Sequence, residues 1–450
     1  MFSGPWSRFR RKERLNMTRA RLDGMYFLLF GSVVFILLGL AAENIANIPM
    51  QDFGVVYDPA RCLIQQCDPY NESEVARVYQ AEKDYGPLVT ANKHHAETRY
   101  VYLPTAFIVT VPFAMLPWGP AHILWMILTI GGLVFASFLI WDLGAIYAPI
   151  VSGVLIGFLL ASSEVIVVLC NSAGIAISLC VVAVWCFFRE RFVLAGILCL
   201  AMSLAIKPQD AGLVWLYFLL AGGVYRKRAL QTLFTVVVLC LPVVLWVWHV
   251  SPHWMQEWHS NVLAYTTHGG NDDTSLAALR IHSRAGVISL QTVFSAFSDN
   301  PLIYNLADYL ACGALLLAWA VCTLRSRFSL PGTWLALASI SALSMLFVRH
   351  HPYDTKLLLL TVPACAMLWT EGGLIGWLAI LLNTVGFLLT GDLLWAIVSG
   401  FINSPHLSTI SRSGQILTDF QVFSVPLILL AMSIFYLWIY MRHDSERDLP

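Results

Sequence analysis

Runs of about 20 apolar residues recur along most of the chain, and short polar segments separate them. Runs of this length cross a bilayer as helices, so the pattern predicts an all-α polytopic membrane protein. The longest polar segment covers 43–99, and a second covers 251–301. We therefore expect a bundle of about 12 transmembrane helices plus partial helices, with a large loop after the first helix.

The polar segments also suggest how the chain is divided. A basic amino-terminal segment covers 1–22, one membrane domain covers 23–441, and a short tail covers 442–450. The membrane domain contains the two long loops at 43–99 and 251–301. Neither an internal repeat nor a low-complexity linker is visible in the sequence.

The apolar runs divide into three expected pairs of helices, two of them at prolines or glycines and the third by the length of 144–188. Tyr100–Leu116 and Ala121–Ile140 read as a hairpin of two crossings, broken at Pro117, Gly119 and Pro120. Residues 144–170 read as a short helical hairpin that enters and leaves at one face. Residues 355–390 hold two helices, broken at Glu371-Gly372-Gly373.

The basic residues predict which side of the membrane each connection faces. Clusters at 8–21, 189–191, 226–228, 325–327 and Arg442 are assigned to the cytoplasm by the positive-inside rule. Both termini are then cytoplasmic, in a cell or inner membrane. The connections at 43–99, near Lys207, at 251–301, 349–354 and 391–419 become extracytoplasmic, and with them ten of the 12 histidines. We therefore expect any chemistry on that outer face.

Composition excludes two classes of protein. The chain is 58% apolar and 12% charged, against about 25% charged in soluble proteins, so a soluble globular protein is excluded. Lys+Arg and Asp+Glu both number 27, so no net basic surface predicts a nucleic-acid partner.

The first candidate for chemistry is Asp52, about ten residues beyond the first apolar run. A carboxylate at the membrane surface, followed by Phe53 and Tyr57, is suited to take a proton from an acceptor hydroxyl. The alternative is a loop aspartate that caps a short helix. Asp58 is the second choice, because Asp58-Pro59 reads as the N-cap and first position of a helix.

Two further segments offer groups for a phosphate. Lys207, before Pro208 and Gln209, could act as a point charge, although a lysine that snorkels to the interface fits the same pattern. Arg349 could bind a phosphate bidentately, while His350 and His351 neutralise a leaving group. Tyr353 and Asp354 are assigned to orienting these histidines. A metal site is poorly supported, since His350-His351 lacks a third ligand at helical spacing.

Three more residues lie on the predicted outer face. Cys62 and Cys67 are close enough for a small disulfide loop, with two free thiols as the alternative. Asn171, at the tip of the partial helices, adds a polar group beside the same site. Aromatic residues of 251–301, such as Trp254 and Trp258, either lie on the membrane surface or stack on a sugar.

Several of these stretches together resemble glycosyltransferase family 87, whose members are polyprenol-phosphate-mannose-dependent mannosyltransferases of the GT-C superfold. The resemblance covers the chain from the first apolar run to about residue 370, and it depends on the order and spacing of short motifs. The motifs are Asp52-Phe53 through Tyr57, Pro69-Tyr70, Tyr102-Leu103-Pro104, Ala205-Ile206-Lys207-Pro208-Gln209 and His351-Pro352-Tyr353-Asp354.

The resemblance implies an inverting transfer of a hexose from a polyprenyl-phosphate donor to a lipid-linked or cell-envelope glycan acceptor, with Asp52 as base. Lys207, Arg349, His350 and His351 would hold the donor phosphate, without a metal or other cofactor. Tyr57, Gln209, Tyr353, Asp354 and Asn171 would orient substrate. The partners would be donor, acceptor and membrane lipids.

Two departures from the family pattern concern the substrates. Cys170-Asn171 stands where relatives often carry Gly-Gln, and Gln66-Cys67-Asp68 replaces a glycine before Pro69-Tyr70. The rival interpretation is a secondary transporter or lipid-glycan flippase. Transporters, however, place polar residues near the midplane and often in two repeated halves.

Overall fold

The computed structural model describes residues 5–45, 51–81, 99–267, 272–276, 287–394, 396 and 412–445. Within these ranges every named element is a helix, and extended segments meet at one bridge, between Ile288 and His350. The prediction of an all-α membrane protein agrees with this architecture.

Six helices among the described residues are long and apolar enough to cross a membrane. They are the Thr18–Ile45 part of α1 (Pro5–Ile45), α5 (Trp118–Gly144), α11 (Gly223–Val250), α15 (Pro301–Arg325), α16 (Leu330–Phe347) and the Val422–His443 part of α20 (Arg412–Ser445).

Shorter helices pack between these six or lie at the ends of the bundle. Those at the ends are α2 (Gln51–Ile64), α3 (Glu72–Ala81), α12 (Trp254–Thr266) and α14 (Leu290–Ser295). The others are η2 (Pro104–Ala106), α4 (Phe107–Ala114), α6 (Pro149–Ala161), α7 (Glu164–Leu169), α8 (Ala173–Arg189), α9 (Val193–Ile206), α10 (Pro208–Leu220), η3 (Pro352–Thr361), α17 (Val362–Glu371) and α18 (Gly373–Leu389).

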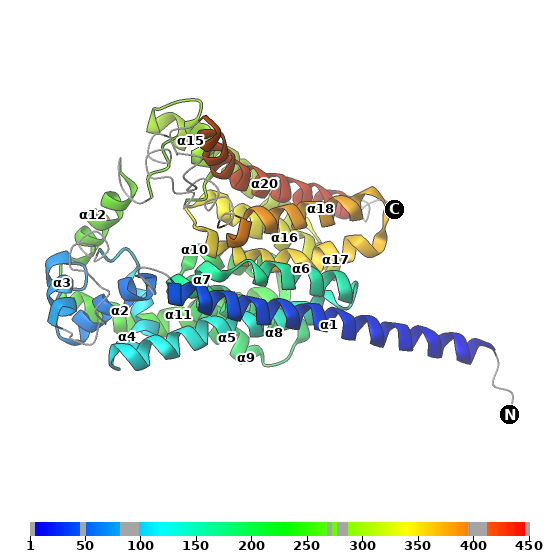
Figure 1. Cartoon of the computed structure of the whole chain (residues 1–450), viewed down its shortest axis with the longest axis horizontal. Helices are drawn as coiled ribbons and strands as arrows, with labels where there is room; N and C mark the ends of the chain where they lie inside the picture. Colours follow the sequence, from blue (N-terminus) through cyan, green and yellow to red (C-terminus); the bar gives the residue numbers. More distant parts are fainter. Residues whose placement is uncertain are drawn as a thin grey trace.

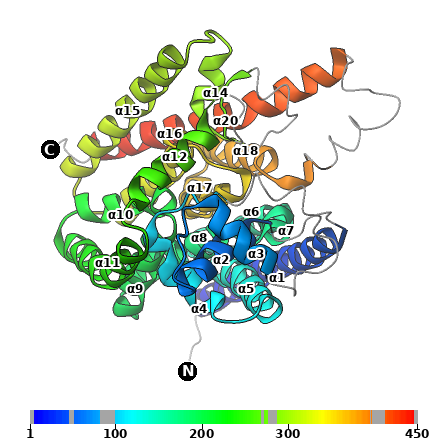
Figure 2. The ribbon, with the colours of Figure 1, turned by 90° about the vertical axis from the view of Figure 1, so that its left-hand side faces the viewer.

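The bundle has two ends of different character. Figure 1 shows α2, α3 and α12 gathered at the left, and Figure 2 looks onto that end, which we call the α2 end. At the opposite end, Arg189 Nη2 contacts Asp142 Oδ2 at 2.6 Å, which holds the last turns of α8 and α5 together. Both marked chain termini also lie on that side in Figure 1.

Residues 144–170 do not form the hairpin that the sequence predicts. Gly24 of α1 meets Pro149 at the start of α6, while Gly39 of α1 meets Val167 in α7. The two short helices therefore follow α1 from the opposite end to the α2 end as one broken crossing. The prediction is wrong because a break at Ser162 and Ser163 interrupts this helix without reversing it.

The predicted crossing over Tyr100–Leu116 is also wrong. Only Pro104–Ala114 is helical there, which rises about 16 Å and cannot cross a hydrocarbon core of about 30 Å. By contrast, the predicted break at Glu371-Gly372-Gly373 is present. Gly372 and Gly373 have φ values of 77° and 68°, which an L side chain rarely adopts, and the chain turns there from α17 into α18.

Glycines bring α1 and α6 into backbone contact. A Cβ atom on Gly153 would meet the carbonyl of Gly24, and one on Gly31 would meet the backbone of Gly157. Lipid supplies no hydrophobic force between membrane helices, so such close van der Waals contact is a main source of their association.

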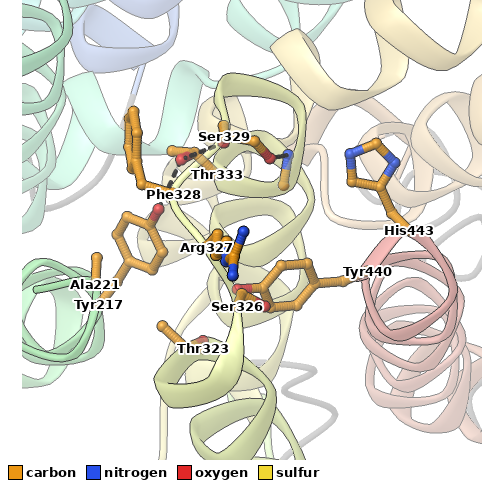
Figure 3. A pocket seen from close by; sticks show the side chains of 11 residues that line it. Tyr217, Ala221, Thr323, Ser326, Arg327, Phe328, Ser329, Thr333, Tyr440 and His443 are labelled. Atoms are coloured by element: carbon orange, nitrogen blue, oxygen red, sulfur yellow. Dashed lines mark hydrogen bonds between the residues drawn. The ribbon is translucent and has the colours of Figure 1, made fainter. Parts of the chain in front are cut away.

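A small cavity at the opposite end lies among α10, the α15–α16 connection and α20 (Figure 3). The Tyr217 hydroxyl donates to Thr333 Oγ1 at 2.7 Å, and the Ser329 side chain caps α16 by accepting from Gly332 N at 3.1 Å. The volume of this cavity is about 20 Å³, which has room for about one water, so a sugar does not fit there.

Some predicted features lie outside the described residues. They are 1–4, 46–50 and 82–98 of the first loop, 268–271 and 277–286 of the second, most of the 391–419 connection, and 446–450 of the tail.

Candidate active site

Polar residues from four breaks between helices converge at the α2 end. We call Asp52, Asn171, Lys207, Asp210, His350 and Asp354 the Asp52 cluster. Asp52 lies in the first turn of α2, Asn171 between α7 and α8, and Lys207 where α9 gives way to α10. His350 and Asp354 flank the start of η3. Residues far apart in the sequence therefore share one site because each stands where a helix is interrupted.

Asn171 holds the predicted base. Its Nδ2 donates to Asp52 Oδ2 at 2.8 Å, while its Oδ1 accepts from Ala173 N at 2.8 Å and from Lys207 Nζ at 3.4 Å. The two donors fix the orientation of the amide, so that its NH₂ group faces the carboxylate. Asn171 thus fixes the position of the Asp52 carboxylate, and its predicted role of orienting substrate stays a prediction.

Lys207 is committed to a buried ion pair. Its Nζ lies 2.6 Å from Asp354 Oδ1 and 4.0 Å from Asp210 Oδ2, and the residue is 4% exposed. Its ammonium also lies 5.1 Å from the centre of the Tyr353 ring. Removing one partner of a buried pair would leave an uncompensated charge. The main contribution of Lys207 is therefore to the stability of the cluster. The interpretation as a snorkelling lysine does not fit a side chain buried this deeply.

His350 stands behind this pair, away from the surface. Its Nδ1 lies 3.2 Å from Asp354 Oδ2 and 3.4 Å from Asp210 Oδ1, and the side chain is fully buried. A nitrogen that faces two carboxylates carries the hydrogen. His350 thus orients Asp354, and its buried position does not suit direct contact with a donor phosphate.

His351 forms the more open side of the site, with the buried ring of Tyr353 beside it. His351 Nε2 lies 3.4 Å from Asp272 Oδ1, and its ring stacks on Tyr353 with centroids 5.1 Å apart. The His351 backbone N–H donates to Asp354 Oδ2 at 2.9 Å. One carboxylate, Asp354, therefore connects Lys207, His350 and the backbone of His351.

Two predicted phosphate or substrate ligands lie beside the cluster. Arg349 is partly exposed, and its Nε donates to Gln291 Oε1 at 3.4 Å, which leaves the terminal nitrogens of the guanidinium for a ligand. Gln209 lies partly exposed in the first turn of α10.

Tyr57 and Asp58 take no part in the cluster. The Tyr57 ring packs at 5.2 Å from Trp118, and its hydroxyl donates to the Leu116 carbonyl at 2.8 Å, so it anchors α2 on the bundle. Asp58 is not an N-cap, because α2 begins at Gln51 and holds Pro59 in its interior. Burial, together with the charge of Asp58, raises the pKa of Tyr79 in α3 to about 12.

Cys62 and Cys67 are joined by a disulfide at the end of α2. The pair packs with Val75 and Val78 of α3, which ties the two surface helices together.

Among the groups with shifted pKa values at the site, Asp52 and His351 bear most directly on proton transfer and charge. Burial raises the pKa of Asp52 above 3.8, although the Asn171 hydrogen bond and the charges of His351 and Lys207 partly offset this. Burial lowers the pKa of His351, but its contact with Asp272 and the charge of Asp354 more than offset this, so the pKa lies above 6.5. Asp52 is therefore a stronger base than an exposed aspartate, and His351 is more often cationic than an exposed histidine.

Asp210, His350 and Asp354 lie close enough together to ligate a metal ion. Lys207, however, already supplies positive charge to both carboxylates. A divalent ion there would have to displace this ammonium. The geometry therefore fits a self-compensated charge network better than a metal centre.

Three residues at the site were not among the predicted site residues, although Tyr102 belongs to a motif that carries the family resemblance. Asp210 is fully buried in the cluster, Asp272 pairs with His351, and the Tyr102 hydroxyl accepts from Ser172 Oγ at 3.2 Å. Asp210 follows Gln209 directly, so a charged residue three positions after Lys207 was the available signal. Asp272 comes from a loop whose approach to His351 no local pattern encodes.

Comparison with known proteins gives one match. The family model for glycosyltransferase family 87 matches residues 100–349. This range includes Asn171, Lys207 and Arg349, while Asp52 precedes it and His350 follows it. No curated protein and no solved structure matches the chain.

Proposed function

The chain belongs to glycosyltransferase family 87, and from this premise we propose that it moves a hexose from a polyprenyl-phosphate donor to a glycan hydroxyl. By family resemblance the hexose is mannose, and the acceptor is a lipid-linked or cell-envelope glycan. The α2 end would face the extracytoplasmic side, with both termini in the cytoplasm, on a GT-C-type bundle of about 12 crossings.

The observation that carries this proposal is the Asp52 carboxylate held by Asn171. Asn171 engages Oδ2 at 2.8 Å, and no described residue donates a hydrogen bond to Oδ1. That oxygen is the one to accept a proton from the acceptor hydroxyl. The raised pKa of Asp52 increases its strength as a base.

The reaction then proceeds by in-line displacement with inversion. The acceptor oxygen forms a bond to the anomeric carbon as its proton passes to Asp52, and the bond from that carbon to the phosphate oxygen breaks. The electron pair leaves with the prenyl phosphate. We assign the stabilisation of the prenyl phosphate to Arg349 and to protonated His351, because both are partly exposed whereas Lys207 and His350 are buried inside the cluster.

We also propose that the transfer needs no metal. The departing phosphate is a monoester, which two cationic side chains can stabilise. Gln209, which is partly exposed, and Tyr353, whose ring is buried against His351, remain candidates for contacting the sugar.

The direct test replaces Asp52 by asparagine in the full-length protein. Asp52→Asn keeps the hydrogen-bonding shape and removes the base, so we expect sugar transfer to fall about 10²–10⁴-fold. The measurement is release of prenyl phosphate and formation of glycosylated acceptor by purified enzyme, with thermal stability as a check of folding. Full activity in this variant would sink the proposal. Movement of a lipid-linked glycan across vesicles without prenyl-phosphate release would favour a flippase instead.

A further inference from the structure

A groove at the opposite end of the bundle lies outside the machinery described above. It has a volume of about 630 Å³ and runs between the first turns of α9 and α11. Arg228, in the same turn of α11, donates to the Phe187 carbonyl at 2.8 Å, which places the groove beside the last turn of α8. The groove is therefore at the membrane face remote from the Asp52 cluster.

The groove is charged at its mouth and mostly apolar along its length, where Gln231 and Thr235 are the polar lining residues. Arg226 and Lys227 lie in the first turn of α11, and Leu230 and Phe234 follow them on the same wall. From Arg226 to Phe234 the helix rises about 12 Å. Leu194 of α9 lies across the groove and is 76% exposed. This order matches a phospholipid, whose phosphate lies at the interface and whose acyl chain runs inward.

The two cations at the mouth are not neutralised by the protein. No acidic residue lines the groove, and neither cation has a carboxylate within salt-bridge distance among the described residues. Glu190, on the preceding loop, pairs instead with Arg228 at 3.4 Å. Arg226 Nε donates to the Leu219 carbonyl at 3.1 Å, which orients the guanidinium and leaves its terminal nitrogens available.

Other basic residues at this end lack one of these two features. Arg189 is paired with Asp142 at 2.6 Å, and Arg191 and Arg325 are exposed but do not line this groove. Unpaired positive charge and a chain-sized apolar groove thus coincide at Arg226 and Lys227. Each basic residue near a membrane surface attracts anionic lipid with about 1 kcal/mol, and a groove makes that attraction specific.

We propose that this groove is a binding site for one anionic phospholipid of the leaflet remote from the Asp52 cluster. Arg226 and Lys227 hold its phosphate, and one acyl chain lies along Leu230 and Phe234 against Leu194. A zwitterionic lipid fills the groove less well, since its head group carries a positive charge that meets two cations.

The test is native mass spectrometry of the full-length protein released from bilayers that contain equal phosphatidylglycerol and phosphatidylcholine. We expect wild-type protein to retain phosphatidylglycerol preferentially. The double variant Arg226→Gln, Lys227→Gln should raise the apparent Kd for phosphatidylglycerol about thirtyfold, because two cations are lost. The matched control, Arg191→Gln with Arg325→Gln, removes the same charge from the same face and should retain the lipid.

Two further measurements distinguish a bound lipid from a bound free anion. Phe234→Ala should weaken phosphatidylglycerol retention with both cations in place, which separates lipid from a free anion. Inorganic phosphate alone should not compete for the site. The proposal is overturned if the control loses lipid equally, if phosphatidylcholine is retained as well as phosphatidylglycerol, or if free phosphate displaces the lipid. Melting temperatures of all variants verify that each is folded.

Discussion

Asn171 determines which oxygen of Asp52 is left for chemistry. Its amide is fixed by Ala173 and Lys207 and occupies Oδ2 of the base. The same hydrogen bond stabilises the ionised form of Asp52 and so opposes the effect of burial on its pKa. A neutral side chain can thereby tune a catalytic base without adding charge to a crowded site.

This arrangement predicts the pH dependence of transfer. The carboxylate is the active form, so kcat/KM should fall at acidic pH as Asp52 takes up a proton, with a midpoint above 3.8. Asn171→Ala removes a donor that lowers the pKa of Asp52, so its acid limb should move to higher pH. A hydrogen bond to a charged group is worth about 1.5–3 kcal/mol. The kcat/KM of Asn171→Ala relative to wild type should therefore be about tenfold lower at the acid end than on the plateau.

The measurement is a pH–rate profile for both proteins, with Ser172→Ala as the control. Ser172 is the neighbour of Asn171 but contacts Tyr102 rather than Asp52, so its replacement should leave the acid limb unchanged. An Asn171→Ala profile that is scaled down uniformly, without movement along the pH axis, would contradict the positioning role.

Lys207 gives a second prediction, because a role in stability and a role in binding the donor phosphate would have different outcomes. Lys207 belongs to the buried pair with Asp354, so losing it should lower the free energy of unfolding by about 3–5 kcal/mol. Lys207→Met should therefore lower the melting temperature strongly, and adding Asp354→Asn should recover much of the loss. A variant that keeps its melting temperature and only raises KM for the donor would instead assign Lys207 to the phosphate.

Helix interruptions, rather than helix surfaces, carry the candidate site. Asn171 follows Cys170, whose backbone is left-handed at φ 49°, and Lys207 is followed by Pro208 at the first position of α10. Backbone groups at such ends are not all used by the helix, so polar side chains collect there. Lys207, His350 and Asp354 are identifiable from sequence because proline and charge interrupt apolar runs at these points.

The sequence was less informative about which residues meet across helices. Hydrophobic length predicted the long helices, but Pro104–Ala114 and the α6–α7 break show that an apolar run need not be one full crossing. Tyr57 shares the motif of Asp52, yet it lies on another face of α2 and packs against Trp118. The pairing of Asp272 with His351 depends on tertiary folding alone.

The glycine contact between α1 and α6 predicts a strong effect of size. Gly157→Val would place a methyl-bearing side chain against the Phe27 carbonyl, so α1 should separate from α6 and the yield of folded protein should fall severely. Gly131→Val in α5 is the matched control, because a Cβ atom there meets nothing within 4 Å. Size-exclusion profiles and melting temperatures measure both. Equal behaviour of the two variants would show that α1 is not held by this contact.

A second buried charge group joins distant parts of the whole molecule beneath the Asp52 cluster. Lys356 in η3 is 1% exposed and interacts electrostatically with Asp392, Glu164 and Asp354. Its Nζ has no hydrogen-bond partner among the described residues, and neither has Glu164 Oε2. Asp392 is fixed from the other side, since its Oδ2 accepts from Val165 N at 3.0 Å and its N–H donates to the Ser162 carbonyl at 2.9 Å. The break between α6 and α7 is thereby linked to the segment after α18.

This group predicts how the global stability responds to charge. Lys356→Met leaves two buried carboxylates without their compensating cation, so unfolding should become easier by about 3 kcal/mol. Lys356→Met with Asp392→Asn removes one charge of each sign and should recover most of the loss, since asparagine can still accept from Val165 N. Thermal unfolding in detergent compares the two variants with wild type. If Lys356→Met alone keeps the wild-type melting temperature, the ammonium does not hold these elements together, and the stability of this region must come from the apolar packing of η3.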